Sequence, residues 1–151
     1  MQWSARLAEL GIELPDVAAP VAAYVPAVRT GSHVYTSGQL PFVGGELAAT
    51  GKVGAEVSPE EAKQYARTAA LNGLAAVHAL VGIDSVVRVV KVVGYVASSE
   101  GFGGQPAVIN GASELLGEVF GEAGAHARAA VGVAELPLGA PVEVELIVEV
   151  A

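Results

Sequence analysis

The residue of this chain with the clearest chemical potential is an arginine set among small residues near the C-terminal end. The segment Gly124–Val150 reads GAHARAAVGVAELPLGAPVEVELIVEV, and Arg128 lies in its first apolar stretch. A half-buried guanidinium needs an anionic partner, because its charge is costly to remove from water. That partner is either a nearby glutamate or the carboxylate of a ligand.

The second half of the same segment supplies carboxylates. After a turn at Leu136-Pro137, every second residue from Val142 to Val150 is apolar. The residues between them are Glu143, Glu145, Ile147 and Glu149. This two-residue alternation predicts a strand with one apolar face. The turn predicts that this strand forms a hairpin with the strand that carries Arg128.

Two interpretations of these residues are open at this point. A carboxylate such as Glu143, close to an anion held by Arg128, could orient a water molecule and take its proton. Alternatively, Arg128 pairs with Glu143 or Glu145 across neighbouring strands and has only a structural role.

Other catalytic patterns are missing from the sequence. His33, His78 and His126 are widely separated and lack the spacing of metal ligands, so we expect no metal site. The glycines of Gly101–Gly104 match neither of the common nucleotide-binding patterns, and we expect no cofactor. Ser37 stands at the end of a predicted strand, outside any GxSxG motif.

Length, charge and composition restrict the function further. A chain of 151 residues suits one domain. Its formal net charge is -8 with only 8 lysines and arginines, which disfavours nucleic acid as a partner. The absence of cysteine excludes disulfides and thiol nucleophiles. Met1–Leu10 lacks the pattern of a secretory signal, and the apolar run Thr68–Ile83 is too short to span a membrane, so we expect a cytoplasmic protein.

Turn residues and apolar spacing predict the N-terminal elements. A short helix at Gln2–Leu10 forms an N-terminal extension of about residues 1–20. A proline-rich coil follows, with Pro15, Pro20 and Pro26. Ser32–Ser37 is predicted as a strand, and Gly44-Gly45 marks a hairpin.

The middle of the chain predicts two helices around a long strand. Ser58–Glu61 combines an N-cap serine, a proline at the first helical position and a glutamate three residues after the cap, so a helix begins there and ends at Gly82. Val86–Val96 is rich in valine and predicts a strand that is covered on both faces. After a loop at Gly101–Pro106, a second amphipathic helix ends at Gly121.

These elements predict an α+β fold in which a mixed β-sheet has two helices packed on one face, in a single domain over residues 1–151. Two helices cover only one face of a sheet. The other face is therefore expected to meet another subunit.

Three segments resemble the RidA family, also called the YjgF/YER057c/UK114 family. They are Tyr24–Pro41 (YVPAVRTGSHVYTSGQLP), the helix start at Ser58–Glu61 and Ala127–Glu145 (ARAAVGVAELPLGAPVEVE). The resemblance spans most of the chain. It implies a chorismate-mutase-like fold and a homotrimer with clefts between its subunits.

The resemblance also implies an activity. Deaminases of this family hydrolyse reactive enamines and imines, such as 2-aminoacrylate, to 2-ketoacids and ammonia. Arg128 would bind the carboxylate of a 2-imino acid or 2-ketoacid through a bidentate fork. Glu143 would position the attacking water. The substrate-binding residues implied in the cleft are Tyr24, Ser37, Gly38, Asn110 and Ala130.

The chain departs from the family pattern, and this leaves alternatives. Ala130 stands where many deaminases of the family carry a cysteine, and the N-terminal extension with the Gly101–Pro106 loop resembles a longer subgroup. A non-catalytic trimer that binds small carboxylates or a protein is the main alternative. Ribonuclease activity, for which parts of the family are named, is disfavoured by the net charge of -8. Chorismate mutase activity would rest on architecture alone.

Overall fold

The computed structural model describes residues 2–17 and 23–151. The helices are α1 (Trp3–Glu9), α2 (Pro59–Val81) and α3 (Gln105–Phe120), with 3₁₀ turns η1 (Ile83–Ser85), η2 (Gly121–Gly124) and η3 (Pro137–Gly139). The strands are β1 (Ala27–Thr30), β2 (His33–Thr36), β3 (Phe42–Val43), β4 (Glu46–Leu47), β5 (Val86–Ala97), β6 (Ala127–Val133) and β7 (Val142–Val150). Pro20 of the predicted coil and residues 1 and 18–20 of the predicted extension lie outside the described residues.

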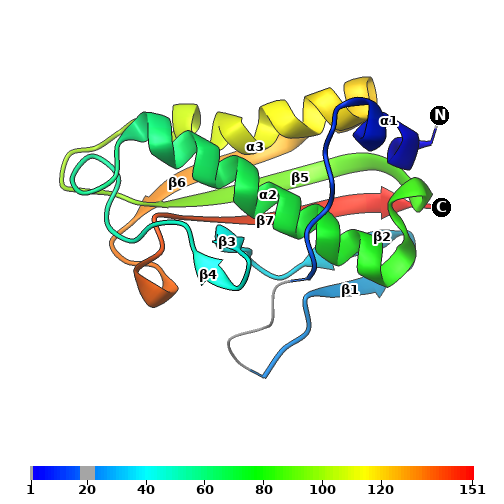
Figure 1. Ribbon diagram of the computed structural model, residues 1–151, viewed down its shortest axis with the longest axis horizontal. Helices are drawn as coiled ribbons and strands as arrows, with labels where there is room; N and C mark the ends of the chain where they lie inside the picture. Colours follow the sequence, from blue (N-terminus) through cyan, green and yellow to red (C-terminus); the bar gives the residue numbers. More distant parts are fainter. Residues whose placement is uncertain (1, 18–22) are drawn as a thin grey trace.

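The main sheet is mixed and has the strand order β1-β2-β7-β5-β6. Strand β5 pairs with β6 in parallel and with β7 antiparallel. Strands β3 and β4 form a separate hairpin around Gly44-Gly45, as the sequence predicts. Figure 1 shows α2 and α3 side by side across one face of the sheet. The predicted α+β fold with two helices on one face is confirmed.

The predicted C-terminal hairpin is wrong, because β5 lies between β6 and β7. The chain leaves β5, passes through α3 and returns as β6 parallel to β5. The segment from Val133 to Val142 then crosses the end of β5, where the Ala97 N–H donates to the Pro141 carbonyl at 2.9 Å. Alternation assigns residues to the faces of a strand but leaves its neighbours unspecified.

Helix α2 begins where the sequence predicts. The Glu61 N–H donates to the Ser58 hydroxyl at 3.1 Å, and the Ser58 N–H donates to the Glu61 carboxylate at 3.2 Å, which completes a capping box. The buried face of α2 is made largely of small residues: Ala62, Ala66, Ala69, Ala70, Gly73, Ala75 and Ala76. This face lets α3 approach so closely that any side chain at Gly111 would overlap the Lys63 carbonyl.

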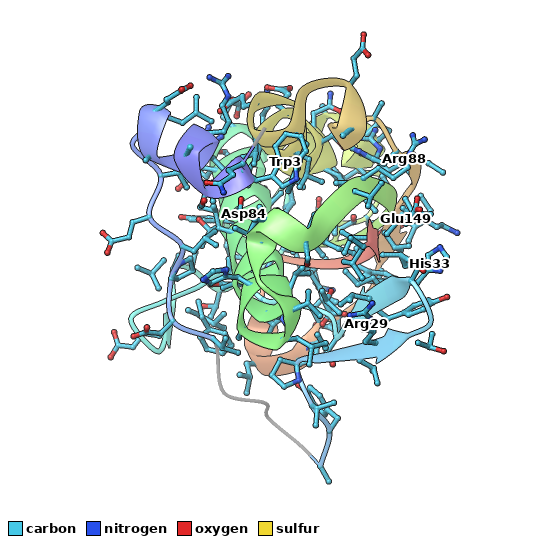
Figure 2. The ribbon with its side chains drawn as sticks, turned by 90° about the vertical axis from the view of Figure 1, so that its right-hand side faces the viewer. Trp3, Arg29, His33, Asp84, Arg88 and Glu149 are labelled. Atoms are coloured by element: carbon cyan, nitrogen blue, oxygen red, sulfur yellow. The ribbon has the colours of Figure 1, made fainter. Side chains whose placement is uncertain are left out.

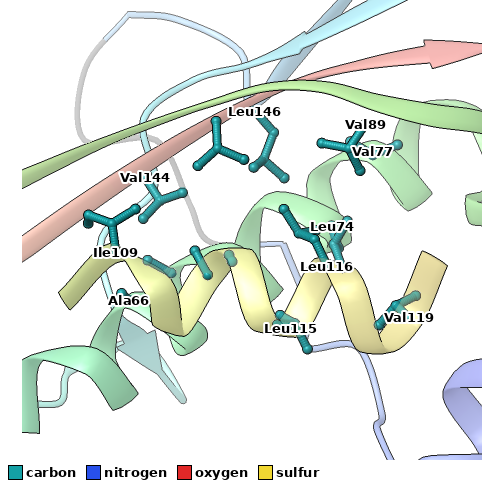
Figure 3. Packing of buried hydrophobic residues seen from close by; sticks show 14 of the residues in the cluster. Ala66, Leu74, Val77, Val89, Ile109, Leu115, Leu116, Val119, Val144 and Leu146 are labelled. Carbon is teal, nitrogen blue, oxygen red and sulfur yellow. The ribbon is translucent and has the colours of Figure 1, made fainter. Parts of the chain in front are cut away.

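The core lies between the helices and the covered face of the sheet. The apolar residues of β7 are at most 2% exposed: Val142, Val144, Leu146, Val148 and Val150. Figure 3 shows Val144 and Leu146 opposite side chains of α2 and α3. Ile109 of α3 fills the space above Gly94 in β5, where a side chain would collide with it. No helix of the described residues is long and apolar enough to cross a membrane.

The N-terminal helix α1 contacts the rest of the protein at two places. The Trp3 ring packs edge-on against Phe120 at 5.1 Å between centroids, and its indole N–H donates to the Val86 carbonyl at 2.7 Å. The Ser4 N–H and hydroxyl both donate to the Asp84 carboxylate, at 2.8 and 2.6 Å. Figure 2 shows Trp3 and Asp84 on this side of the molecule. Helix α1 therefore stabilises the start of β5 and the end of α3.

The sheet face away from the helices, called the open face here, is half-exposed and mixed in character. It carries Tyr35, Lys91, Val93, Tyr95, Glu143, Glu145 and Ile147. At one end of it, His33 and Arg88 both pair in register with Glu149 (Figure 2). Among the described residues, β5 is thus covered on the helix side alone.

Candidate functional site

The sequence-predicted site residues fall into two groups on opposite faces of the sheet. Arg128 pairs with Val92, which is buried beneath the helices. Glu143 pairs with Tyr95 on the open face. Directly paired residues point to the same side of a sheet. Arg128 therefore points to the helix side with Val92, and Glu143 points to the open face with Tyr95. The interpretation in which Arg128 forms an ion pair with Glu143 or Glu145 across neighbouring strands is therefore wrong.

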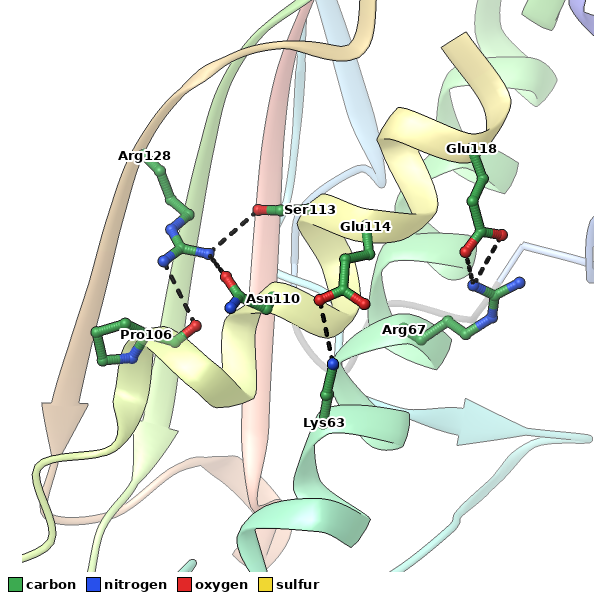
Figure 4. Close-up of polar contacts among 8 residues, drawn as sticks. All are labelled: Lys63, Arg67, Pro106, Asn110, Ser113, Glu114, Glu118 and Arg128. Atoms are coloured by element: carbon green, nitrogen blue, oxygen red, sulfur yellow. Dashed lines mark hydrogen bonds and ion pairs between the residues drawn. The ribbon is translucent and has the colours of Figure 1, made fainter. Parts of the chain in front are cut away.

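Arg128 is held by three residues of α3 (Figure 4). Its Nη1 donates to Asn110 Oδ1 at 2.7 Å and to Ser113 Oγ at 3.3 Å. Its Nη2 donates to the Pro106 carbonyl at 3.4 Å. These acceptors are all neutral, and Arg128 has no carboxylate partner among residues 2–17 and 23–151. The guanidinium therefore retains an uncompensated positive charge, which favours an anionic ligand.

Two further residues complete this network, and the sequence reasoning missed both. Ser113 Oγ lies 2.8 Å from Nε2 of His126, and Nδ1 of the same ring lies 2.6 Å from the Gly124 carbonyl. The position of each residue in the sequence could have indicated that it lies beside a predicted site residue. Ser113 follows Asn110 by three positions on a helix, and His126 precedes Arg128 by two positions in extended chain, so each pair shares one face.

Ala130 lies on the same side of β6 as Arg128. It is half-buried and packs against the core. Gly132 comes next on this side, and a Cβ atom there would lie 2.7 Å from Nε2 of Gln105. Helix α3 begins at Gln105, so part of the predicted Gly101–Pro106 loop is helical. Small residues thus line β6 from Arg128 towards the start of α3.

On the open face, Glu143 lies against the backbone of Gly38. A methyl group at Gly38 would lie 2.7 Å from Cδ of Glu143, so a larger residue there would displace the end of the Glu143 side chain. Paired hydrogen bonds of 2.8 and 3.0 Å between the backbones of Gln39 and Val144 hold the two segments together. The Glu143 carboxylate accepts no hydrogen bond from the described residues, and it remains available to water or to a ligand.

The environment of Glu143 makes its carboxylate more basic. Burial raises the pKa of the Glu143 carboxyl above its ordinary value, and the negative charge of Glu145 raises it further. The Tyr95 hydroxyl donates to Glu145 Oε1 at 2.8 Å, and this bond raises the pKa of Tyr95. The proton therefore stays on the tyrosine. An ionised Glu143 is therefore a better proton acceptor than an ordinary glutamate.

Ser37 connects this group to the segment that carries Tyr24. Its hydroxyl donates to the Val25 carbonyl at 2.6 Å, and its N–H donates to the Pro26 carbonyl at 2.8 Å. Tyr24, the neighbour of Val25, is exposed. Ser37, Gly38 and Glu143 are therefore brought together, with the Tyr24 segment tied to them.

A protein-family model described as "YjgF/chorismate mutase-like, putative endoribonuclease" matches residues 4–150. The chain belongs to the YjgF/RidA family. Among family relatives, Protein TCP17 of Trypanosoma cruzi is 48% identical over 150 residues, which cover 97% of this chain and 92% of that protein.

Solved structures of similar proteins share the YjgF/RidA fold. The crystal structure of Atu1372, a protein of unknown function from Agrobacterium tumefaciens, is 46% identical with a TM-score of 0.90, covering 99% of this chain and 92% of that one. A "putative endoribonuclease" from Shewanella oneidensis is 33% identical with a TM-score of 0.94, covering 99% and 100%. The chorismate-mutase-like arrangement expected from the sequence is thus confirmed.

Proposed function

We propose that this protein is an enamine/imine deaminase that hydrolyses 2-imino acids to 2-ketoacids and ammonia. The observation that supports this most directly is the state of Arg128, whose guanidinium is held by neutral acceptors and has no carboxylate partner among the described residues. A guanidinium binds a carboxylate through two parallel N–H···O bonds. Imino acids and ketoacids share that carboxylate, so one anchor would serve substrate and product.

Glu143 is the proposed general base. Its carboxylate takes a proton from water as the water oxygen attacks the imine carbon, and the electron pair of the C=N bond moves to nitrogen. The nitrogen receives that proton from Glu143. After a second proton passes from the new hydroxyl group to nitrogen, the C–N bond breaks, ammonia leaves and the 2-ketoacid remains. A raised pKa suits a group that must both accept and return a proton.

A second copy of the chain is needed to bring the anchor and the base together. The group of Arg128, Asn110 and Ala130 lies at the edge strand β6, and the group of Glu143 and Gly38 lies on the open face. We propose that the β6 edge of one subunit meets the open face of the next. Such a head-to-tail contact can close into a ring, and the family resemblance indicates a ring of three.

A homotrimer is therefore expected in solution. Light scattering should give about three times the chain mass of 15.1 kDa. Ile147→Asp, which places a charge on the open face, should release monomers and abolish activity. Val43→Asp, on the exposed β3–β4 hairpin, is the matched control and should leave the trimer intact. A stable monomer with full deaminase activity would contradict an intersubunit site.

The activity is tested by ammonia release. When 2-iminobutanoate is generated in the assay by an amino-acid oxidase, the protein should accelerate formation of ammonia and 2-ketobutyrate beyond the spontaneous rate. A non-catalytic carboxylate-binding trimer would bind 2-ketobutyrate and leave the rate of ammonia formation unchanged.

We place this activity in the cytoplasm, a reducing compartment in which a chain without cysteine needs no disulfide.

Ribonuclease activity, which appears in the description of the family, is less well supported. The chain carries a formal net charge of -8. Glu143, Glu145 and Glu149 stand on the open face, which would repel a phosphate backbone. RNA cleavage that persisted after extensive purification and after replacement of Arg128 would favour this alternative.

A further inference from the structure

We infer that Ser113 and His126 are positioning residues for the carboxylate anchor, which fix Arg128 at Nη1 and leave Nη2 and Nε, the other edge of the guanidinium fork, for the two oxygens of the ligand. The inference rests on the proposed role of Arg128 in binding a carboxylate. It concerns neither the base nor the reacting atoms. It assigns a function to the two polar side chains that surround Arg128 in addition to Asn110.

The hydrogen bonds around His126 have only one consistent direction when its ring is neutral. The Gly124 carbonyl can only accept, so Nδ1 of His126 carries the proton. Nε2 is then an acceptor, and the Ser113 hydroxyl donates to it. With its proton committed to the ring, the Ser113 oxygen presents its lone pairs to Nη1 of Arg128. Donors and acceptors thus match from the backbone carbonyl to the guanidinium.

The Gly124 carbonyl, at one end of this chain of hydrogen bonds, is held in place by close packing. Gly124 is buried in η2, and any side chain at this position would overlap the backbone carbonyl of Leu116 in α3. The close packing holds the Gly124 carbonyl in place and, through it, the ring of His126. Rotating the ring by half a turn would direct a carbon atom at that carbonyl and lose the hydrogen bond.

The two terminal nitrogens of the Arg128 guanidinium differ in their hydrogen bonds. Nη1 has two acceptors, at 2.7 Å from Asn110 and 3.3 Å from Ser113. Nη2 has a single contact of 3.4 Å, at the exposed Pro106 carbonyl. A ligand carboxylate can replace that weak contact while Nη1 stays fixed. An anchor that is already oriented loses less freedom on binding, and this strengthens affinity.

Ser113 contributes little to the fold by comparison. It is half-buried, whereas the apolar core-facing residues of α3 are Val108, Ile109, Ala112, Leu115, Leu116, Val119 and Phe120. Serine inside a helix is less favourable than alanine. Ser113→Ala loses its hydrogen bonds to His126 and Arg128 but gains helix propensity, so its thermal stability should change little. A loss of ligand affinity in the same variant would separate positioning from a structural role.

The experiment measures affinity and guanidinium order together. Calorimetric titration with 2-ketobutyrate should give a dissociation constant about 5- to 10-fold higher for Ser113→Ala than for the parent trimer, because Ser113 orients Arg128 without touching the ligand and its loss should cost no more than an ordinary hydrogen bond. Ser113→Thr, which keeps the hydroxyl, should restore most of the affinity. In ¹⁵N NMR spectra, the Nη signals of Arg128, assigned by their absence in Arg128→Lys, should show faster rotation in Ser113→Ala.

Ser85→Ala is the matched control, because the Ser85 hydroxyl donates to the Gly82 carbonyl far from Arg128. Ser85→Ala should change neither the affinity for 2-ketobutyrate nor the rotation of the Arg128 Nη groups. If Ser113→Ala binds 2-ketobutyrate as the parent does and its Arg128 signals are unchanged, the positioning role is overturned. Weaker binding of 2-ketobutyrate by Arg128→Lys would in that case still support Arg128 as the anchor. If the parent binds no better than Arg128→Lys, the anchor itself is refuted, and the positioning role with it.

Discussion

Exchanging Glu143 for glutamine is expected to lower turnover of 2-iminobutanoate by about 10²- to 10⁴-fold, the usual contribution of a general base. Glutamine keeps the shape of the side chain but cannot accept a proton. Affinity for 2-ketobutyrate should change little, because the carboxylate is assigned to Arg128. Glu145→Gln is the control: Glu145 accepts from Tyr95, so its loss should have a much smaller effect on turnover. Parent-like turnover in Glu143→Gln would require another base.

The same exchange should raise thermal stability at neutral pH. Folding raises the pKa of Glu143, so the folded state favours the protonated carboxyl. Stability therefore falls as pH rises from the ordinary glutamate value through the raised folded value, and the ionised group remains unfavourable above that window. Melting curves recorded across this range should show the parent losing stability relative to Glu143→Gln. Below the ordinary glutamate value the two should converge, and a variant less stable at every pH would contradict this account.

Arg128→Lys should weaken 2-ketobutyrate binding by about 10- to 100-fold, the effect expected when a hydrogen bond to a charged group is lost. Lysine keeps the charge but lacks the planar fork that engages both carboxylate oxygens. It also cannot reproduce the contacts to Asn110 and Ser113. Calorimetric titration measures the affinity, and light scattering establishes that the trimer persists.

Arg67→Lys provides a matched control for this variant, since Arg67 forms a partly exposed pair with Glu118 between α2 and α3. It should leave ligand affinity unchanged. If Arg128→Lys instead lowered the melting temperature and bound 2-ketobutyrate like the parent, Arg128 would be a structural residue and the deaminase proposal would lose its main support.

Much of the fold could be predicted from the sequence because its signals are local. The capping box at Ser58 and Glu61 depends on four consecutive residues, and it is present in the structure. The alternation from Val142 to Val150 depends on strand geometry alone, and it assigned the core-facing side chains correctly. Local rules of this kind hold whatever the rest of the chain does.

The arrangement of the site depends on distant pairing and could not be predicted in this way. A turn at Leu136-Pro137 indicates a change of direction, but whether β7 pairs with β6 depends on competition with β2 and β5. That competition separates Arg128 from Glu143. Ser113 and His126 were missed for a related reason, because they meet only once α3 packs against β6.

The central position of β7 affects how the protein can be made. This strand follows all the others in the sequence, yet it lies between β2 and β5 and joins them. While the chain is emerging from the ribosome, the hairpin of β1 and β2 has no partner strand in the main sheet. Contacts between segments so far apart in sequence form slowly, and unpaired strand edges meanwhile favour aggregation. The main sheet can therefore be completed only after β7 has been synthesised.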